Sequence, residues 1–286
     1  MTENMVQKAH DRLCGENACG LMLRYCRSRI GRAGILMLAF LSMAVIVSCG
    51  SDEAGEKSRP DVFYTARGKK ITITPIKHAS LQINYDGREF EIDPVCSHVG
   101  PVLSYLDKPK ADFILVTNKQ LDHFDDYAIH VLTAPYTELI IPKDIWYQMR
   151  IGNVMENNMY MKIGGNSVIY CVPAYNISKK NAKRHPKGLW NGYVLDFDGF
   201  RIYIAGDTEY IPEMKELKNI SVAFLPVSRF TMDLKQLRQA VETIKPKIVY
   251  PYHFYNADTA QIRSALSGAG AEVRIRYLRQ WQWGIG

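Results

Sequence analysis

The chain has 286 residues, of which 47% are hydrophobic and 23% are charged. This composition is typical of a globular protein and excludes wholesale disorder and fibrous repeats. The formal net charge of +7 would by itself suggest an acidic partner such as nucleic acid or a membrane surface. The basic residues, however, are unevenly spread along the chain.

The first 48 residues have the layout of an export signal. Four arginines between positions 24 and 32 precede an uncharged run from Ala33 to Ser48, which is the order found in secretory signal peptides. The run is shorter than the ~20 apolar residues that a spanning helix needs. It ends in Ile46-Val47-Ser48-Cys49, which resembles the lipobox of bacterial lipoproteins and implies cleavage before Cys49 and lipidation of its thiol. An uncleaved membrane anchor is the alternative, and either Met1 or Met22 could be the start.

We therefore expect a signal peptide over residues 1–48, a polar tether over 49–61 and one folded domain over 62–286. The protein would be exported and lipid-anchored to a bacterial membrane, on the periplasmic side of the outer membrane or at the cell surface. Removing residues 1–48 takes away six of 36 basic and three of 29 acidic residues, which lowers the net charge to +4. No basic stripe interleaved with aromatic residues remains, so we expect no nucleic-acid partner. The sequence does not settle whether Cys96 and Cys171 form a disulfide, nor the oligomeric state.

Two segments of the chain share one plan. Residues 80–93 and 192–205 each alternate apolar and polar residues around a central Asp-Gly pair, Asp86-Gly87 and Asp198-Gly199, which is the pattern of a β-hairpin. An apolar strand follows each hairpin, at 112–116 and 221–225, and a segment with helical periodicity follows each strand. Further strands are predicted at 136–141 and 247–252. These repeats favour an α/β domain of two packed sheets covered by helices.

Ionisable residues fall in the loops that follow these predicted strands, where catalytic groups and ligands tend to lie. Asp122, His123, Asp207 and His253 together offer two carboxylates and two imidazoles, a complete set for zinc or a partial set for iron or manganese. Each also has a structural explanation: Asp122 could cap a helix that begins near Phe124, Asp207 could belong to a simple turn, and His253 could be a satisfied core histidine.

The order of these motifs resembles the metallo-β-lactamase superfamily, in particular its ascorbate-phosphate lactonase-like branch, from about Ile71 to Tyr255. The matching pieces are Lys77-His78-Ala79-Ser80, Ile92-Asp93-Pro94, Gly206-Asp207-Thr208 and Pro251-Tyr252-His253. The resemblance implies a four-layer αββα sandwich of two similar halves, with the site at one edge of the sheets. It also implies two metals bridged by Asp207, the second of them held by Asp122, His123 and His253.

At the central motif the chain departs from the family pattern. Asn118 and Gln120 stand where the family has the two leading histidines that hold the first metal. The third ligand of that metal corresponds to Asn176 or to His185, and the sequence leaves both open. Because amides are poor ligands for zinc, we expect one well-held divalent metal, zinc before manganese or iron, with Asp122 as both ligand and catalytic residue.

The function that this pattern predicts is a lipid-anchored hydrolase that acts on a phosphoester, lactone or similar ester. A single metal suffices for this chemistry, because it lowers the pKa of bound water toward ~7 and polarises a substrate oxygen. A dense group of basic residues at 179–187 could attract a small anionic substrate, or could simply be a solvated loop. The alternative function is a ligand-binding lipoprotein with a degenerate metal site and no catalysis.

Overall fold

The computed structural model describes residues 60–98, 102–254 and 258–276. The expected signal peptide, Cys49 and nearly all of the expected tether lie outside these residues. Within the described ranges, no helix is long and apolar enough to cross a bilayer. Asp61, the last residue of the expected tether, begins the first strand.

The described residues form two mixed sheets of seven strands, each with its strands in sequence order. The first sheet contains β1 (Asp61–Tyr64), β2 (Lys70–Lys77), β3 (Ser80–Tyr85), β4 (Arg88–Ile92), β5 (Phe113–Leu115), β6 (Glu138–Ile141) and β7 (Asn153–Val154). The second contains β8 (Tyr160–Lys162), β9 (Ser167–Ala174), β10 (Trp190–Phe197), β11 (Phe200–Ile204), β12 (Ile220–Pro226), β13 (Ile248–Tyr252) and β14 (Glu272–Val273).

Both sheets follow the same topology, which confirms the predicted duplication. In each, the first four strands pair antiparallel and the last three add in parallel. The predicted hairpins are β3–β4 and β10–β11. Asp86, Gly87, Asp198 and Gly199 all have φ between 52° and 88°, as a two-residue type I′ turn requires.

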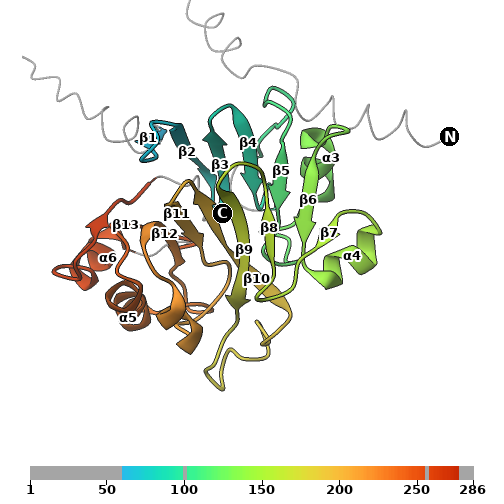
Figure 1. The fold of residues 1–286 in the computed structure, drawn as a ribbon. Helices are drawn as coiled ribbons and strands as arrows, with labels where there is room; N and C mark the ends of the chain where they lie inside the picture. Colours follow the sequence, from blue (N-terminus) through green and yellow to red (C-terminus); the bar gives the residue numbers. More distant parts are fainter. Residues whose placement is uncertain (1–59, 99–101, 255–257, 277–286) are drawn as a thin grey trace, which may run out of the picture. The chain divides into compact units, whose positions relative to one another are not determined.

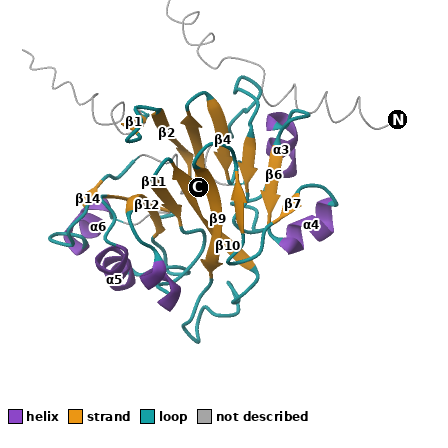
Figure 2. Cartoon of the chain, in the orientation of Figure 1, coloured by secondary structure: helices purple, strands orange, loops and turns teal. Residues whose placement is uncertain are grey.

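Helices cover the outer side of each sheet. The first half contributes α3 (Asp126–Leu132) and α4 (Lys143–Met149), and the second contributes the 3₁₀ helix η1 (Pro212–Glu216), α5 (Leu234–Ile244) and α6 (Thr259–Ala265). Figures 1 and 2 show α3 and α4 on one side of the strands and α5 and α6 on the other. The expected αββα sandwich is therefore confirmed.

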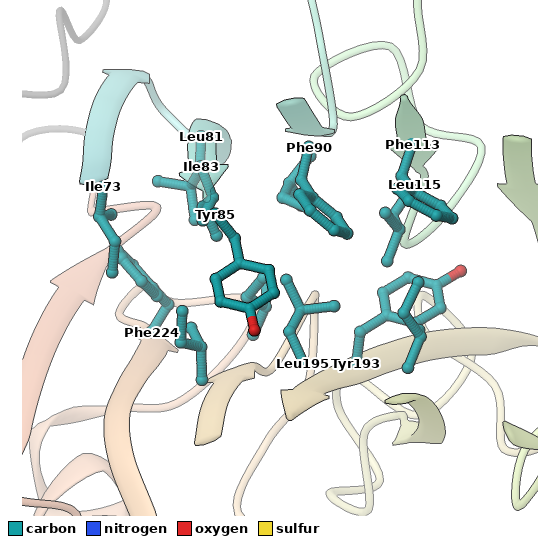
Figure 3. Close-up of a cluster of buried hydrophobic side chains, with 14 of the residues drawn as sticks. Ile73, Leu81, Ile83, Tyr85, Phe90, Phe113, Leu115, Tyr193, Leu195 and Phe224 are labelled. Carbon is teal, nitrogen blue, oxygen red and sulfur yellow. The ribbon is translucent and has the colours of Figure 1, made fainter. Parts of the chain in front are cut away.

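The largest hydrophobic core lies between the two sheets. Its side chains come from the inward faces of both, and Figure 3 shows those of the first sheet pointing at those of the second, among them Tyr85, Phe90, Tyr193 and Phe224. A second core lies between the second sheet and its helices, and a third lies between the first sheet and its helices. Cys96 and Cys171 are both buried and are not bonded to each other, so the open question about a disulfide is answered in the negative.

The helix that follows β5 is capped by a different residue from the one considered above. Asp125, not Asp122, is the N-cap of α3, because its carboxylate accepts the backbone N–H groups of Tyr127 and Ala128. The helix begins at Asp126 and leaves Phe124 in the preceding turn. Asp122 is therefore available for the site.

Candidate metal centre

The predicted ligands meet at one edge of the two sheets. His78 follows β2, Asp122 and His123 lie in the loop after β5, Asp207 follows β11, and His253 follows β13. His78 and His253 have positive φ values of 46° and 57°, a backbone conformation that is costly for residues other than glycine and that clusters at functional sites.

The imidazoles and carboxylates of this cluster are in close contact. The ligand atoms of His78, Asp122, His123 and His253 all lie within 4.8 Å of one another. The Asp122 Oδ2 atom is 3.2 Å from His78 Nε2 and 3.4 Å from His253 Nε2. Asp207 adds a second carboxylate, whose Oδ2 is 3.2 Å from His123 Nε2 and whose Oδ1 is 3.1 Å from His253 Nε2. All four predicted ligands are thus brought together, and His78 joins them.

These distances fit a divalent metal. Ligand atoms about 2.0–2.2 Å from one tetrahedral zinc lie roughly 3.3–3.6 Å from each other, close to the separations seen here. Both oxygens of Asp207 and the Nε2 of His123 are buried without a hydrogen-bond partner among the described residues. Buried polar atoms left in this state are costly, and a metal between them would satisfy them.

Asp93 orients the His123 ring so that its Nε2 faces the site. Its other ring nitrogen, Nδ1, lies 2.7 Å from Asp93 Oδ2, and the Asp93 carboxylate also accepts the N–H and the hydroxyl of Thr117. The proton of the neutral ring is thereby held on Nδ1, which leaves the lone pair on Nε2. Carboxylate–histidine pairs of this kind orient metal ligands in many proteins.

The charges of the cluster are strongly coupled. Burial would raise the pKa of Asp207, but His123 and His253 outweigh burial and bring that pKa below its usual value. Burial likewise opposes a charge on His123, yet the carboxylates of Asp207, Asp93 and Asp122 raise its pKa well above 6.5. Burial, reinforced by His253, lowers the pKa of His78 to about 3. A metal must therefore displace a proton from His123, so acid competes with metal.

A glycine and a tyrosine place Asp207. Gly206 has φ +65°, and a Cβ atom there would be 2.7 Å from the carbonyl oxygen of Asn191 and 3.2 Å from Thr117 Cβ. Only glycine fits this close approach between the two halves of the fold. The Gly206 N–H donates to the hydroxyl of Tyr252, which is fully buried. Tyr252 thus supports the turn that carries Asp207.

Asn118 and Gln120 lie in the loop that carries Asp122 and His123 and offer amides instead of an acid or imidazole. Asn118 is fully buried, its Oδ1 accepts the Gln120 N–H at 2.8 Å, and its Nδ2 has no hydrogen-bond partner among the described residues. The Gln120 side chain is half-buried. The leading positions therefore offer a buried amide donor where the family has histidines.

Asn176 and His185, the two residues left open as a third ligand, contact each other. Asn176 Nδ2 lies 2.9 Å from His185 Nδ1 and donates to the carbonyl oxygen of Phe230 at 2.8 Å. The His185 Nε2 atom lies 3.4 Å from Asp207 Oδ2. Burial lowers the pKa of His185, so its ring is neutral at pH 7. His185 is therefore the residue of this pair that faces the cluster.

The basic loop that contains His185 is held in place by hydrogen bonds to Glu209. The Glu209 carboxylate accepts the N–H groups of Ile177 and Ser178 at 2.9 and 2.7 Å and the Asn181 amide at 3.3 Å. Three lysines of the loop are exposed, namely Lys179, Lys180 and Lys183, whereas Lys187 pairs with Glu213 at 2.9 Å. The loop is therefore held by hydrogen bonds to Glu209 and exposes a positively charged surface.

Two residues of the site were not assigned a role from the sequence. His78 and Asp93 both lie in motifs that carried the family resemblance, yet nothing in the sequence indicated that they touch Asp122 and His123. The separations are 44 and 30 residues. A histidine or aspartate directly after a predicted strand was the available signal.

Comparison with known proteins identifies the family. The model of the "Beta-lactamase superfamily domain" matches residues 72–253, well over half of the chain. The chain belongs to the beta-lactamase superfamily. A protein of Methanopyrus kandleri, named as a UPF0173 metal-dependent hydrolase, is 33% identical over 72% of this chain and 95% of its own length.

Solved structures agree with this membership. A protein of Parabacteroides distasonis, whose crystal structure presents it as a candidate metal-dependent hydrolase, is 42% identical. It covers 77% of this chain and 99% of its own, with a TM-score of 0.73. Igni18, a metallo hydrolase of Ignicoccus hospitalis, is 25% identical over 72% of this chain and 94% of its own, with a TM-score of 0.60.

Proposed function

We propose that this member of the beta-lactamase superfamily is a hydrolase that works with one divalent metal, zinc in the first place and manganese or iron otherwise. The metal would be held by the acid and imidazole cluster at the sheet edge, that is by Asp122, His123, Asp207 and His253, with His78 in contact. The relatives named as metal-dependent hydrolases support the reaction class.

The observation that carries the proposal is the set of ligand separations of 3.1–3.4 Å around Asp122 and Asp207. A metal bound there lowers the pKa of a coordinated water and polarises a substrate oxygen. A single metal is favoured because Asn118 and Gln120 replace the leading histidines of the family.

Asp122 is the catalytic residue in this proposal. Its side chain is 18% exposed, whereas those of His123 and Asp207 are almost fully buried, so Asp122 lies on the side from which substrate and water arrive. Burial would raise the Asp122 pKa, but His123, His253 and His78 outweigh it and lower the pKa. The ionised Asp122 Oδ2 can accept a hydrogen from water and orient it for attack on an ester.

The substrate that we propose is a small anionic molecule with a phosphoester, lactone or similar ester bond. The exposed lysines of the loop at 179–183 would raise the local concentration of an anion. The ascorbate-phosphate lactonase-like branch is the part of the superfamily that this proposal favours, on the motifs around His78, Asp93, Asp207 and His253.

Metal analysis of the full chain, purified in detergent without chelator and supplied with zinc, manganese or iron, tests this function. We expect about one equivalent in the wild type and less than about a tenth in Asp207→Ala, because that variant removes the carboxylate shared by two histidines. Asp196→Ala is the control, since Asp196 caps the hairpin turn at Gly199 and should keep the metal.

The alternative, a binding lipoprotein without catalysis, makes a different prediction. Less than about a tenth of an equivalent in the wild type with every metal supplied would contradict a metal-dependent reaction. One equivalent of metal without turnover of phosphodiesters, phosphomonoesters and lactones would favour the binding function. Turnover of one of these esters that requires the supplied metal and is lost in Asp122→Asn would support the hydrolase.

We also propose that the protein is exported and lipid-anchored through Cys49, on the outer-membrane periplasmic side or at the cell surface. The support is the order of arginines, apolar run and lipobox-like residues before Cys49. Growth with a radiolabelled fatty acid should label the wild type and should not label Cys49→Ala. Equal labelling of both proteins would exclude lipidation at this residue.

A further inference from the structure

His123 and His185 both approach Asp207, but their second ring nitrogens have opposite neighbours. His123 Nδ1 faces a carboxylate, that of Asp93, at 2.7 Å. His185 Nδ1 faces an amide nitrogen, that of Asn176, at 2.9 Å. A carboxylate accepts a hydrogen and an amide nitrogen donates one. The contacts of the two imidazoles therefore favour opposite tautomers of their neutral rings.

The orientation of the Asn176 amide follows from its other contacts. Its nitrogen also lies 2.8 Å from the carbonyl oxygen of Phe230 and 3.3 Å from that of Asn181. Both are acceptors, so the atom that faces them must be the N–H₂ group. His185 Nδ1 consequently accepts, and its ring proton is on Nε2. A doubly protonated ring would bring N–H against N–H and is excluded by the same contact.

An imidazole that carries its proton on Nε2 has no lone pair there to give to a metal. We propose that His185 is a substrate-binding residue, which donates Nε2–H to an oxygen of a phosphate or carboxylate ester, and is not a metal ligand. The assignment of an ester as the bound molecule rests on the proposed function. The donor itself rests on geometry: His185 Nε2 is buried, has no hydrogen-bond partner among the described residues and lies 3.4 Å from Asp207 Oδ2.

The surroundings of His185 suit a donor that is fixed before substrate arrives. The Glu209 carboxylate accepts the Ser178 N–H and holds the loop in place, and the centre of the Trp190 ring lies 5.5 Å from the centre of the His185 imidazole. Preorganised donors of this kind bind and stabilise developing negative charge without reorganisation. The neutral Nε2–H of His185 would thus serve as such a donor beside Asp207.

The tautomer can be measured directly. Two-bond ¹H–¹⁵N spectra of the full chain, with ¹⁵N-labelled histidine, should show His185 neutral and protonated on Nε2. Asn176→Asp replaces the donor by an acceptor of the same shape and should move the His185 proton to Nδ1. Asn176→Ala should leave His185 without a preferred tautomer. A wild-type His185 protonated on Nδ1 would overturn the proposal.

Binding measurements separate a substrate donor from a ligand. His185→Ala should keep the wild-type zinc content and bind inorganic phosphate about tenfold more weakly, the loss expected for one hydrogen bond. His185→Gln, whose amide can supply the N–H, should recover most of that loss. Loss of zinc in His185→Ala, or unchanged phosphate binding, would overturn the proposal. A wild type without zinc would contradict the proposed function, while the tautomer and phosphate measurements on the metal-free chain would still decide the role of His185.

Discussion

At the scale of single residues, the proton that a metal must displace from His123 is the one on Nε2, because the Asp93 carboxylate accepts the Nδ1 proton and leaves Nε2 facing Asp207. Asp93→Asn would use its one oxygen for the Thr117 N–H, now 2.7 Å from Oδ1. The new amide N–H₂ would then face His123 and move the ring proton to Nε2. We expect zinc to bind about 10–100-fold more weakly.

Competition with a chromophoric chelator measures this affinity, and circular dichroism checks the fold. Asp112→Asn is the matched control, because Asp112 also accepts a backbone N–H, that of Glu89 at 2.8 Å, away from the cluster. Equal zinc affinity in Asp93→Asn and wild type would show that Asp93 does not orient His123.

The sequence singled out the four candidate acidic and imidazole ligands because each lies in a loop after a strand that the sequence pattern predicted. It could not predict the roles of Asp93, Asn176 and His78. Their importance depends on which atom of a distant residue they face, and those contacts connect positions 9 to 44 residues apart. A ring tautomer in particular is decided by a three-dimensional contact and has no signature in a sequence.

At the scale of elements, the central strand β4 carries a buried acid, Glu91, outside the metal cluster. Glu91 is 1% exposed and its Oε1 has no partner among the described residues. Burial raises its pKa from 4.5 to about 8, against the attraction of Lys108 and with the repulsion of Glu89. Folded Glu91 therefore keeps a proton between pH 4.5 and 8 that the unfolded chain loses, so this group destabilises the fold increasingly as pH rises through that window.

Glu91→Gln should abolish this part of the pH dependence. At pH 8 the variant should be more stable than the wild type by a few kcal/mol, since each unit of pKa shift corresponds to about 1.4 kcal/mol. At pH 4.5 the two should be similar. Urea unfolding between pH 5 and 8 measures the slope. Glu138→Gln, at the exposed start of β6, is the control and should keep the wild-type slope, and a parallel slope for Glu91→Gln would contradict the assignment.

The elements themselves were largely predictable. Asp-Gly turns with alternating flanks gave both hairpins, and apolar runs gave β5, β6, β12 and β13, because local backbone preference and one-sided burial both leave patterns in sequence. The strands β1, β2, β7, β8, β9 and β14 were not predicted, and four of them, β1, β7, β8 and β14, are short strands at the sheet edges. Two to four residues are too few for a period, and these strands exist because a neighbouring strand offers its hydrogen bonds.

At the scale of the described domain, Asp61 connects the two sheets. It lies in β1 of the first sheet, and its carboxylate accepts the Tyr250 hydroxyl at 2.7 Å from β13 of the second. Arg274 and Arg276, which follow β14, donate to it at 2.6–2.9 Å. These contacts join residues that are 189–215 positions apart in the sequence, which explains why the sequence alone placed Asp61 in a tether. The carboxylate is largely buried, so its charge-assisted hydrogen bonds are stronger than those of a surface pair.

Asp61→Asn should therefore destabilise the fold by about 1–3 kcal/mol, because it weakens bonds to two arginines that stay partly buried. Glu272→Gln is the control: Glu272 also pairs with Arg274 at 2.6 Å but is 57% exposed, and an exposed pair contributes about 0–1 kcal/mol. Urea unfolding of the full chain at neutral pH measures both. If the two variants lose the same small amount, Asp61 does not hold the sheets together, and the apolar core between them must supply that stability alone.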